Sequence, residues 1–193
     1  LKADRIGFLP EESRGSAYCD SPVLIGQGQT CSQPSLVAEM ANMLELRQGM
    51  TVREVGAGSG YAAAIISHIV GCAGHVVAVE RIPELAKFAE KNLRNHFGHE
   101  FEKRITVLNK DGTVLHSGEP EYDRILISAA APPGFNPKIL AKGLKKGSGI
   151  LLFPSGRKGG SQAIRKIVYE NGRVKENTLL NEVMFVPLIG KNT

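Results

Sequence analysis

Short apolar runs of the kind that form β-strands alternate with longer helical patterns from Thr51 onward. The order is TVREVG, YAAAIISHIVG, HVVAVE, PELAKFAEKNLRNHF, ITVLN, DRILISAA, a helix-length segment at 136–144 and GILLFP. Such alternation is typical of βαβ units, whose parallel strands form a sheet covered by helices on both faces. The runs VVAVE, ILISA and ILLFP are nearly all apolar, as central parallel strands should be. The pattern predicts a doubly wound α/β fold with a mostly parallel sheet of about seven strands.

The chain on either side of this alternation follows other patterns. After Pro154 the β-like runs are separated by the turn signal Asn171-Gly172, which predicts a hairpin. Before Thr51, the segment PSLVAEMANMLEL has helical spacing, with Pro34 at a favourable first helical position. The first 23 residues show little periodicity, and we interpret them as an irregular arm.

The length of 193 residues and a hydrophobic content of 42% favour a single domain with one core. The net charge of +5 is compatible with acidic substrates, with nucleic acid or with ordinary surface charge. Cys19, Cys31 and Cys72 have no C-x-x-C or metal-like spacing, which favours a reducing compartment. No run approaches the ~18 apolar residues of a membrane span, and no stretch resembles a signal peptide. We therefore expect a cytoplasmic protein with no membrane partner.

A glycine-rich turn separates the first predicted strand from the helix after it. Its sequence runs Glu54-Val55-Gly56-Ala57-Gly58-Ser59-Gly60-Tyr61. Glycines at such a turn permit positive φ angles and let a ligand approach the backbone closely. The pattern differs from the dinucleotide fingerprint G-x-G-x-x-G, because Tyr61 stands where the third glycine would be. The cofactor-binding residues predicted here are Gly56, Ala57, Gly58, Ser59 and Gly60.

The next two predicted strands also end in residues suited to a nucleoside. Glu80, followed by Arg81, ends HVVAVE, where an acidic side chain can accept hydrogen bonds from ribose hydroxyls. Asp111-Gly112 follows ITVLN, where a carboxylate or a backbone group can meet an adenine. Any one of these features is also explained by ordinary turn chemistry. Because all of them lie at the carboxyl edge of one sheet, they together predict a nucleoside pocket.

These motifs, in this order, resemble the class I S-adenosylmethionine-dependent methyltransferases. Their surroundings are similar to the protein-L-isoaspartate O-methyltransferase family, and the similarity spans essentially the whole chain. It includes Tyr18-x-Asp20-x-Pro22, the loop IGQGQTCSQP at 25–34, Tyr122-Asp123, Ser128-Ala129-Ala130 and the closing Phe185-Val186-Pro187-Leu188. The loop at 25–34 is the most specific part. The sequence departs from the family where Cys31 replaces an aliphatic residue and where Arg53 occupies a normally apolar strand position.

The resemblance implies a Rossmann-like methyltransferase fold that uses S-adenosyl-L-methionine to methylate L-isoaspartyl residues of damaged proteins, a protein-repair reaction. The attacking α-carboxylate has an ordinary pKa of about 4 and is ionised at neutral pH, so no general base is needed. Ser32 is the implied catalytic residue, and Gln29 and Thr30 are implied cofactor contacts. The implied substrate contacts are Thr30, Ser32, Val186, Pro187 and Leu188, the last three through backbone pairing with a peptide.

The resemblance also implies a division of the single domain at 1–193. We expect an arm with the substrate and cofactor loop at 1–33, a cofactor core at 51–154 and C-terminal strands at 155–193. We expect a monomer that binds no nucleic acid. The histidines have no metal-ligand spacing, so no metal is expected.

Several of these residues also fit alternative roles, which stay open at the level of sequence. Ser32, two residues before Pro34, is also a good helix-capping candidate, and the segment at 186–188 also suits a core strand with proline at its edge. A methyltransferase of this fold acting on tRNA would suit the basic charge, although no strip of basic and aromatic residues is present. A nucleotide-binding module without catalysis would leave the loop at 25–34 unexplained.

Overall fold

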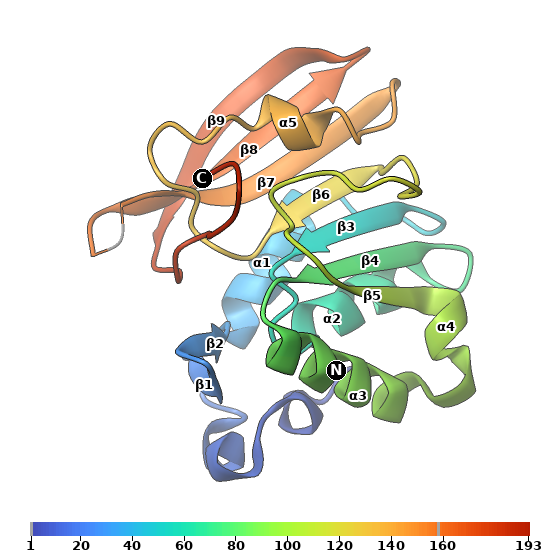
Figure 1. Cartoon of the computed structure of the whole chain (residues 1–193), viewed down its shortest axis with the longest axis vertical. Helices are drawn as coiled ribbons and strands as arrows, with labels where there is room; N and C mark the ends of the chain where they lie inside the picture. Colours follow the sequence, from blue (N-terminus) through green and yellow to red (C-terminus); the bar gives the residue numbers. More distant parts are fainter. Residues whose placement is uncertain (1, 158) are drawn as a thin grey trace.

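The computed structural model describes residues 2–157 and 159–193 (Figure 1). The described residues form a seven-stranded sheet with the strand order β5-β4-β3-β6-β7-β8-β9. Neighbours from β5 to β7 pair in parallel, whereas β7, β8 and β9 pair antiparallel. The predicted doubly wound, mostly parallel sheet is thus confirmed. The order reverses direction between β3 and β6, which is the place where ligands bind in open α/β sheets.

The elements have the following bounds. The strands are β1 (Val23–Gly26), β2 (Gln29–Cys31), β3 (Thr51–Val55), β4 (His75–Glu80), β5 (Ile105–Asn109), β6 (Arg124–Ile127), β7 (Ser148–Gly156), β8 (Gln162–Glu170) and β9 (Arg173–Val183). The α-helices are α1 (Pro34–Met43), α2 (Tyr61–Val70), α3 (Pro83–Phe97), α4 (Phe101–Arg104) and α5 (Lys138–Ala141). The 3-10 helices are η1 (Arg5–Phe8), η2 (Glu11–Ser16) and η3 (Gly98–Glu100).

The two faces of the sheet are covered differently. On one face, Val52, Val76 and Leu126 pack with apolar side chains of α1, α2 and α3. On the other face, Val55 and Ile125 pack with the short α5, with loop residues and with the C-terminal tail. The sequence predicted helices on both faces, but the segment at 136–144 forms only the single turn of α5. Loops and the tail supply the remaining cover on that side.

Local sequence signals explain several element ends. Pro34 and Pro83 occupy the first turns of α1 and α3, where a missing N–H costs nothing. Asn171 and Gly172 both have positive φ, at 51° and 74°, in the turn between β8 and β9. Two positive φ angles are what a tight hairpin turn requires, so the predicted hairpin is confirmed.

Residues 2–23, which the sequence analysis interpreted as part of an irregular arm, are more ordered than the sequence predicted. They contain η1 and η2, followed by the β1–β2 hairpin, in which Val23 pairs with Cys31. The segment at 25–34 therefore comprises the end of β1, the hairpin tip, β2 and the residues up to the first position of α1. The interpretation as an irregular arm was wrong, because short 3-10 turns leave no repeating hydrophobic pattern for sequence analysis to detect. None of the helices in the described part of the chain is long and apolar enough to span a membrane.

Candidate active site

The glycine-rich turn lies between β3 and α2 at the carboxyl edge of the sheet. Gly56, Gly58 and Gly60 have φ angles of 87°, 55° and 86°. Non-glycine residues adopt such angles only at a cost. A Cβ at Gly60 would also lie 2.9 Å from Leu93 Cγ. The turn keeps its backbone exposed to a ligand because it has almost no side chains of its own.

Glu80 connects this turn to the end of β4. Its Oε2 accepts a hydrogen bond from the Gly58 N–H at 3.0 Å, and its Oε1 accepts one from the Ile82 N–H at 2.9 Å. Each carboxylate oxygen can accept more than one hydrogen bond. Glu80 therefore positions the turn and retains acceptor capacity for hydroxyl groups in the adjoining cavity.

Two adjoining cavities follow this edge within the described part of the chain. The Glu80 cavity, of about 620 Å³, is lined by residues that include Gln29, Thr30, Glu80, Arg81, Gly112 and 186–189. The Ser32 cavity, of about 540 Å³, is lined by Ser32, Glu54, Ser59, Tyr61, Ser128, Phe185 and apolar neighbours. Each volume includes the open mouth of its cavity, and a concave lining of apolar groups with a few polar ones is typical of small-molecule sites. Thr30, Gly56, Gly58 and Ser128 line both cavities, so the two form one elongated site.

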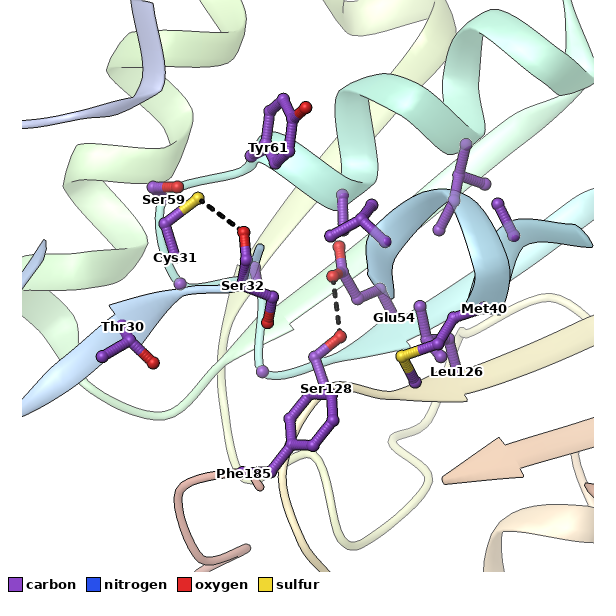
Figure 2. Close-up of a pocket in the computed structure, with 17 residues that line it drawn as sticks. Thr30, Cys31, Ser32, Met40, Glu54, Ser59, Tyr61, Leu126, Ser128 and Phe185 are labelled. Carbon is purple, nitrogen blue, oxygen red and sulfur yellow. Dashed lines mark hydrogen bonds between the residues drawn. The ribbon is translucent and has the colours of Figure 1, made fainter. Parts of the chain in front are cut away.

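Ser32 follows β2 and lines the Ser32 cavity (Figure 2). Gln33 is the N-cap residue of α1, but its side chain forms no capping hydrogen bond. Instead the Ser35 N–H at the start of α1 donates to Asp20 Oδ1 at 2.9 Å. Asp20 thus performs the capping that the sequence suggested for Ser32. The capping interpretation of Ser32 was wrong, and its hydroxyl remains available in the cavity.

Glu54 is the residue of this site that sequence analysis did not select. It is 1% exposed, and its Oε1 accepts a hydrogen bond from Ser128 Oγ at 3.1 Å (Figure 2). Its Oε2 is buried and has no hydrogen-bond partner among the described residues. Burial raises its pKa to about 8, although the Ser128 hydrogen bond acts in the opposite direction. The available signal was an acidic residue directly beside the glycine turn, in a strand short enough to be buried.

The carboxylate of Asp111 is occupied by contacts within the protein. It accepts hydrogen bonds from the Thr113 N–H at 2.8 Å, the Thr113 hydroxyl at 2.7 Å and the Lys191 N–H at 2.7 Å. Burial raises the pKa of Asp111, but these hydrogen bonds outweigh burial and hold it below its ordinary value. Asp111 thus anchors the C-terminal tail, whereas Gly112 lines the Glu80 cavity.

The segment at 186–188 is extended beside Ala130. The Ala130 N–H donates to the Val186 carbonyl at 2.7 Å, and the Leu188 N–H donates to the Ala130 carbonyl at 2.8 Å. Backbone groups alternate in direction along an extended chain. The opposite edge therefore presents the Pro187 carbonyl, and Pro187 has no N–H to donate.

The predicted residues thus gather at one edge of the sheet. Val186, Pro187 and Leu188 line the Glu80 cavity together with Gln29 and Thr30. Ala57 and Ser59 line the Ser32 cavity, whereas Gly60 lies behind the turn, against α3. Cys31 also lines the Ser32 cavity, and burial raises the pKa of its thiol. Among the described residues, no group of three or more histidine, cysteine, aspartate or glutamate side chains could hold a metal ion.

A mostly parallel sheet with this order, a glycine turn after β3 and an acidic residue at the end of β4 define the class of S-adenosylmethionine-dependent α/β methyltransferases. The family model for protein-L-isoaspartate(D-aspartate) O-methyltransferase matches residues 1–193. The chain belongs to that family.

Relatives and solved structures agree with this assignment. The chain is 42% identical over 192 residues to a protein-L-isoaspartate O-methyltransferase of Methanosarcina mazei, covering 100% of this chain and 75% of the relative. It is 44% identical over 190 residues to the enzyme of that name from Ignicoccus hospitalis, covering 98% and 86%. It also superposes on a crystal structure from Plasmodium falciparum assigned as a protein-L-isoaspartate O-methyltransferase in complex with S-adenosyl-L-homocysteine. That match has a TM-score of 0.81 and 26% identity, and it covers 98% of this chain and 87% of the other.

Proposed function

We propose that this chain transfers the methyl group of S-adenosyl-L-methionine to the α-carboxylate of L-isoaspartyl residues in damaged proteins. The observation that carries the proposal is the position of Ser32. Its hydroxyl is not used to cap α1, and it lines a cavity that continues past the glycine turn to Glu80. A substrate carboxylate and a nucleoside cofactor can therefore meet in one elongated site.

The residues present fit the cofactor. Glu80 has acceptor capacity for ribose hydroxyls, and the backbone at Gly112 lines the same cavity for an adenine. The unpartnered Oε2 of Glu54 suits the ammonium group of the methionine part, because a buried polar atom without a partner is costly. Bound S-adenosyl-L-methionine supplies a methyl group attached to a positively charged sulfur. Gln29, Thr30, Arg81 and Ser59 complete the proposed cofactor contacts.

The protein's own contribution is positioning and the exclusion of water. The substrate carboxylate is already ionised, so no side chain has to remove a proton. In the proposed mechanism the Ser32 hydroxyl donates a hydrogen bond to this carboxylate and selects the oxygen that attacks. Met40, Leu126 and Phe185 make the neighbouring wall apolar, which strengthens the interactions inside. The products are a methyl ester and S-adenosyl-L-homocysteine.

Backbone contacts suit a substrate of variable sequence. We propose that the peptide lies along the free edge of the segment at 186–188, where it donates a hydrogen bond to the Pro187 carbonyl and packs beside Val186 and Leu188. The proposed division assigns the substrate loop to 1–33, the cofactor core to 51–154 and the C-terminal strands to 155–193. The proposal extends to a monomer acting on proteins, and not on nucleic acid, in the cytoplasm. The unpaired thiols of Cys19, Cys31 and Cys72 support a reducing compartment.

The test is transfer of labelled methyl from S-adenosyl-L-methionine to a short peptide that contains L-isoaspartate. The matched controls are the same peptide with ordinary aspartate and a sample of unmodified tRNA. We expect base-labile label on the isoaspartyl peptide alone, because a carboxyl methyl ester hydrolyses in base. Label on tRNA, or cofactor binding without label on any of the three, would overturn the proposal.

A further inference from the structure

The N-terminal arm contains a buried arginine that the proposed mechanism does not use. Arg5 lies in η1 and is 3% exposed. Within the described residues its guanidinium forms no salt bridge. An apolar side chain would fill the same space without the cost of burying a charge. The contacts of this arginine must therefore account for its presence.

The guanidinium binds two separate stretches of backbone. Within the arm, its Nη1 donates to the Ala17 carbonyl at 3.1 Å and to the Cys19 carbonyl at 3.0 Å, and its Nη2 donates to the Ser21 carbonyl at 2.8 Å. Charged donors form stronger hydrogen bonds than neutral ones. Arg5 thus fixes the chain where it approaches the β1–β2 hairpin.

The second stretch is the segment that contains Ser32. Arg5 Nη2 donates to the Cys31 carbonyl at 3.1 Å and to the Ser32 carbonyl at 3.0 Å. Cys31 and Ser32 lie 26 and 27 positions away from Arg5 in the sequence. The backbone of Ser32 is therefore held from behind, while the residue itself lines the cavity.

Arg5 also contacts the cofactor side of the site. Its guanidinium carbon lies 5.9 Å from the ring centroid of Tyr61, the first residue of α2 after the glycine turn. A cation at this distance is attracted to an aromatic ring. One side chain thus connects the Ser32 segment with the helix that follows the cofactor turn.

We propose that Arg5 is a positioning residue, which fixes the distance between the Ser32 segment and the cofactor turn during methyl transfer. The inference rests on the proposed function of this site. A shift of about 1 Å in reacting groups can lower a rate by about 10²-fold. Loss of Arg5 should consequently reduce turnover, whereas the glycine turn and Glu80 should still bind the cofactor product.

The experiment compares Arg5→Met and Arg5→Lys with the control Arg124→Met. Arg124 is also a buried arginine bonded to backbone carbonyls, at Leu44 and Asp123, but it lines neither cavity. For each variant we would measure kcat and KM on the isoaspartyl peptide, the Kd of S-adenosyl-L-homocysteine, and hydrogen exchange at 17–33. We expect Arg5→Met to lower kcat by about 10²-fold, with a much smaller change in Kd and faster exchange at 17–33.

The control and the conservative variant separate positioning from general stability. Arg124→Met should lower Tm and leave both kcat and exchange at 17–33 close to wild type. Arg5→Lys keeps the charge but has fewer donors, so its kcat should lie between those of wild type and Arg5→Met. If Arg5→Met does not fold, the same comparison between Arg5→Lys and Arg124→Met decides the question.

Two results would overturn the inference. One is an unchanged kcat in a folded Arg5 variant, and the other is a loss of S-adenosyl-L-homocysteine affinity as large as the loss of kcat. Failure of the proposed function gives a different result, because wild type would then be inactive on the isoaspartyl peptide. In that case exchange at 17–33 still shows whether Arg5 holds the segment.

Discussion

Replacing Arg53 with methionine would test whether a buried ion pair holds the loop at 110–121 against the sheet. Arg53 is 0% exposed in β3, and its Nε lies 2.8 Å from Glu119 Oε2. Its Nη1 and Nη2 donate to the carbonyls of Gly112 and Val114, each at 2.8 Å. Glu119 also accepts a hydrogen bond from the Tyr122 hydroxyl at 2.6 Å. The substitution therefore removes the donor of two carbonyls, and it leaves the buried carboxylate of Glu119 with its Tyr122 hydrogen bond but without its cation.

The expected cost follows from the burial of both partners. Their side chains are 0% and 6% exposed, and removal of one partner of a buried pair costs about 3–5 kcal/mol. For a chain of this size each kcal/mol lowers Tm by about 2–4 °C, so Tm should fall by about 6–20 °C. Since Gly112 lines the Glu80 cavity, the affinity for S-adenosyl-L-homocysteine should also fall, by about tenfold.

The pH dependence gives a second test of the same pair. Burial raises the pKa of Glu119, but hydrogen bonds from Arg53 and Tyr122 outweigh burial and hold it below its ordinary value. Because the pKa of Glu119 is lower in the folded than in the unfolded protein, the ion pair contributes fully to folding stability above the unfolded pKa. This contribution is lost as the pH falls through the folded pKa. The loss in free energy of unfolding of Arg53→Met relative to wild type should thus be largest near neutral pH and should shrink in acid.

The assay is urea denaturation of wild type and Arg53→Met at a series of pH values from neutral into acid. Titration calorimetry at neutral pH measures the affinity of each protein for S-adenosyl-L-homocysteine. Lys175→Met is the control, because the Lys175–Glu170 pair is exposed at 61% and 52% and such pairs contribute little. A deficit below about 1 kcal/mol, as for an exposed pair, would refute the reasoning. A deficit that does not change with pH would refute the assignment of its cause to Glu119.

Three further substitutions test other parts of the site. Ser32→Ala should lower kcat on the isoaspartyl peptide by about 10-fold or more, with little change in S-adenosyl-L-homocysteine affinity; equal losses in both would contradict a substrate role. Glu54→Gln should alter the pH dependence of stability. Burial raises the Glu54 pKa from 4.5 to about 8, so wild-type stability should fall as the pH rises between these values, by about 1.4 kcal/mol per pH unit. Urea denaturation should show no such slope in the variant, and an unchanged slope would contradict this origin. Gly60→Ala should cost about 1–3 kcal/mol in backbone strain plus a clash with Leu93. The control is thermal denaturation of Gly49→Ala, because Gly49 has a similar φ of +80° but no atom within 4 Å of an added Cβ. Equal losses of stability in the two variants would argue against the clash.

The sequence predicted the architecture because that information is local and periodic. Apolar runs of strand length alternate with amphipathic segments, and the glycines after β3 mark a turn that only small residues can form. The motif order then placed Glu80 and Gly112 on the same edge of the sheet as the glycine turn. For the same reason the tight turn at Asn171-Gly172 could be predicted from these two residues alone, without knowledge of how β8 and β9 pair.

Contacts between distant segments could not be predicted in this way. Asp20, and not Ser32, caps α1, since the chain folds back over 15 positions to reach Ser35. The carboxylate of Asp111 binds the tail at Lys191, 80 positions away. No local pattern distinguishes these polar residues from others with the same neighbours, so their partners appear only in the folded chain.

The sequence by itself thus determined the alternation of strands and helices from Thr51 onward and the place of the cofactor turn, because backbone geometry depends on neighbouring residues. The tertiary structure decided what the buried polar groups do. Arg5, Arg53 and Glu54 each occupy an interior position where an unpaired charge is costly. Their partners, or the lack of one at Glu54 Oε2 among the described residues, depend on segments that only packing brings together.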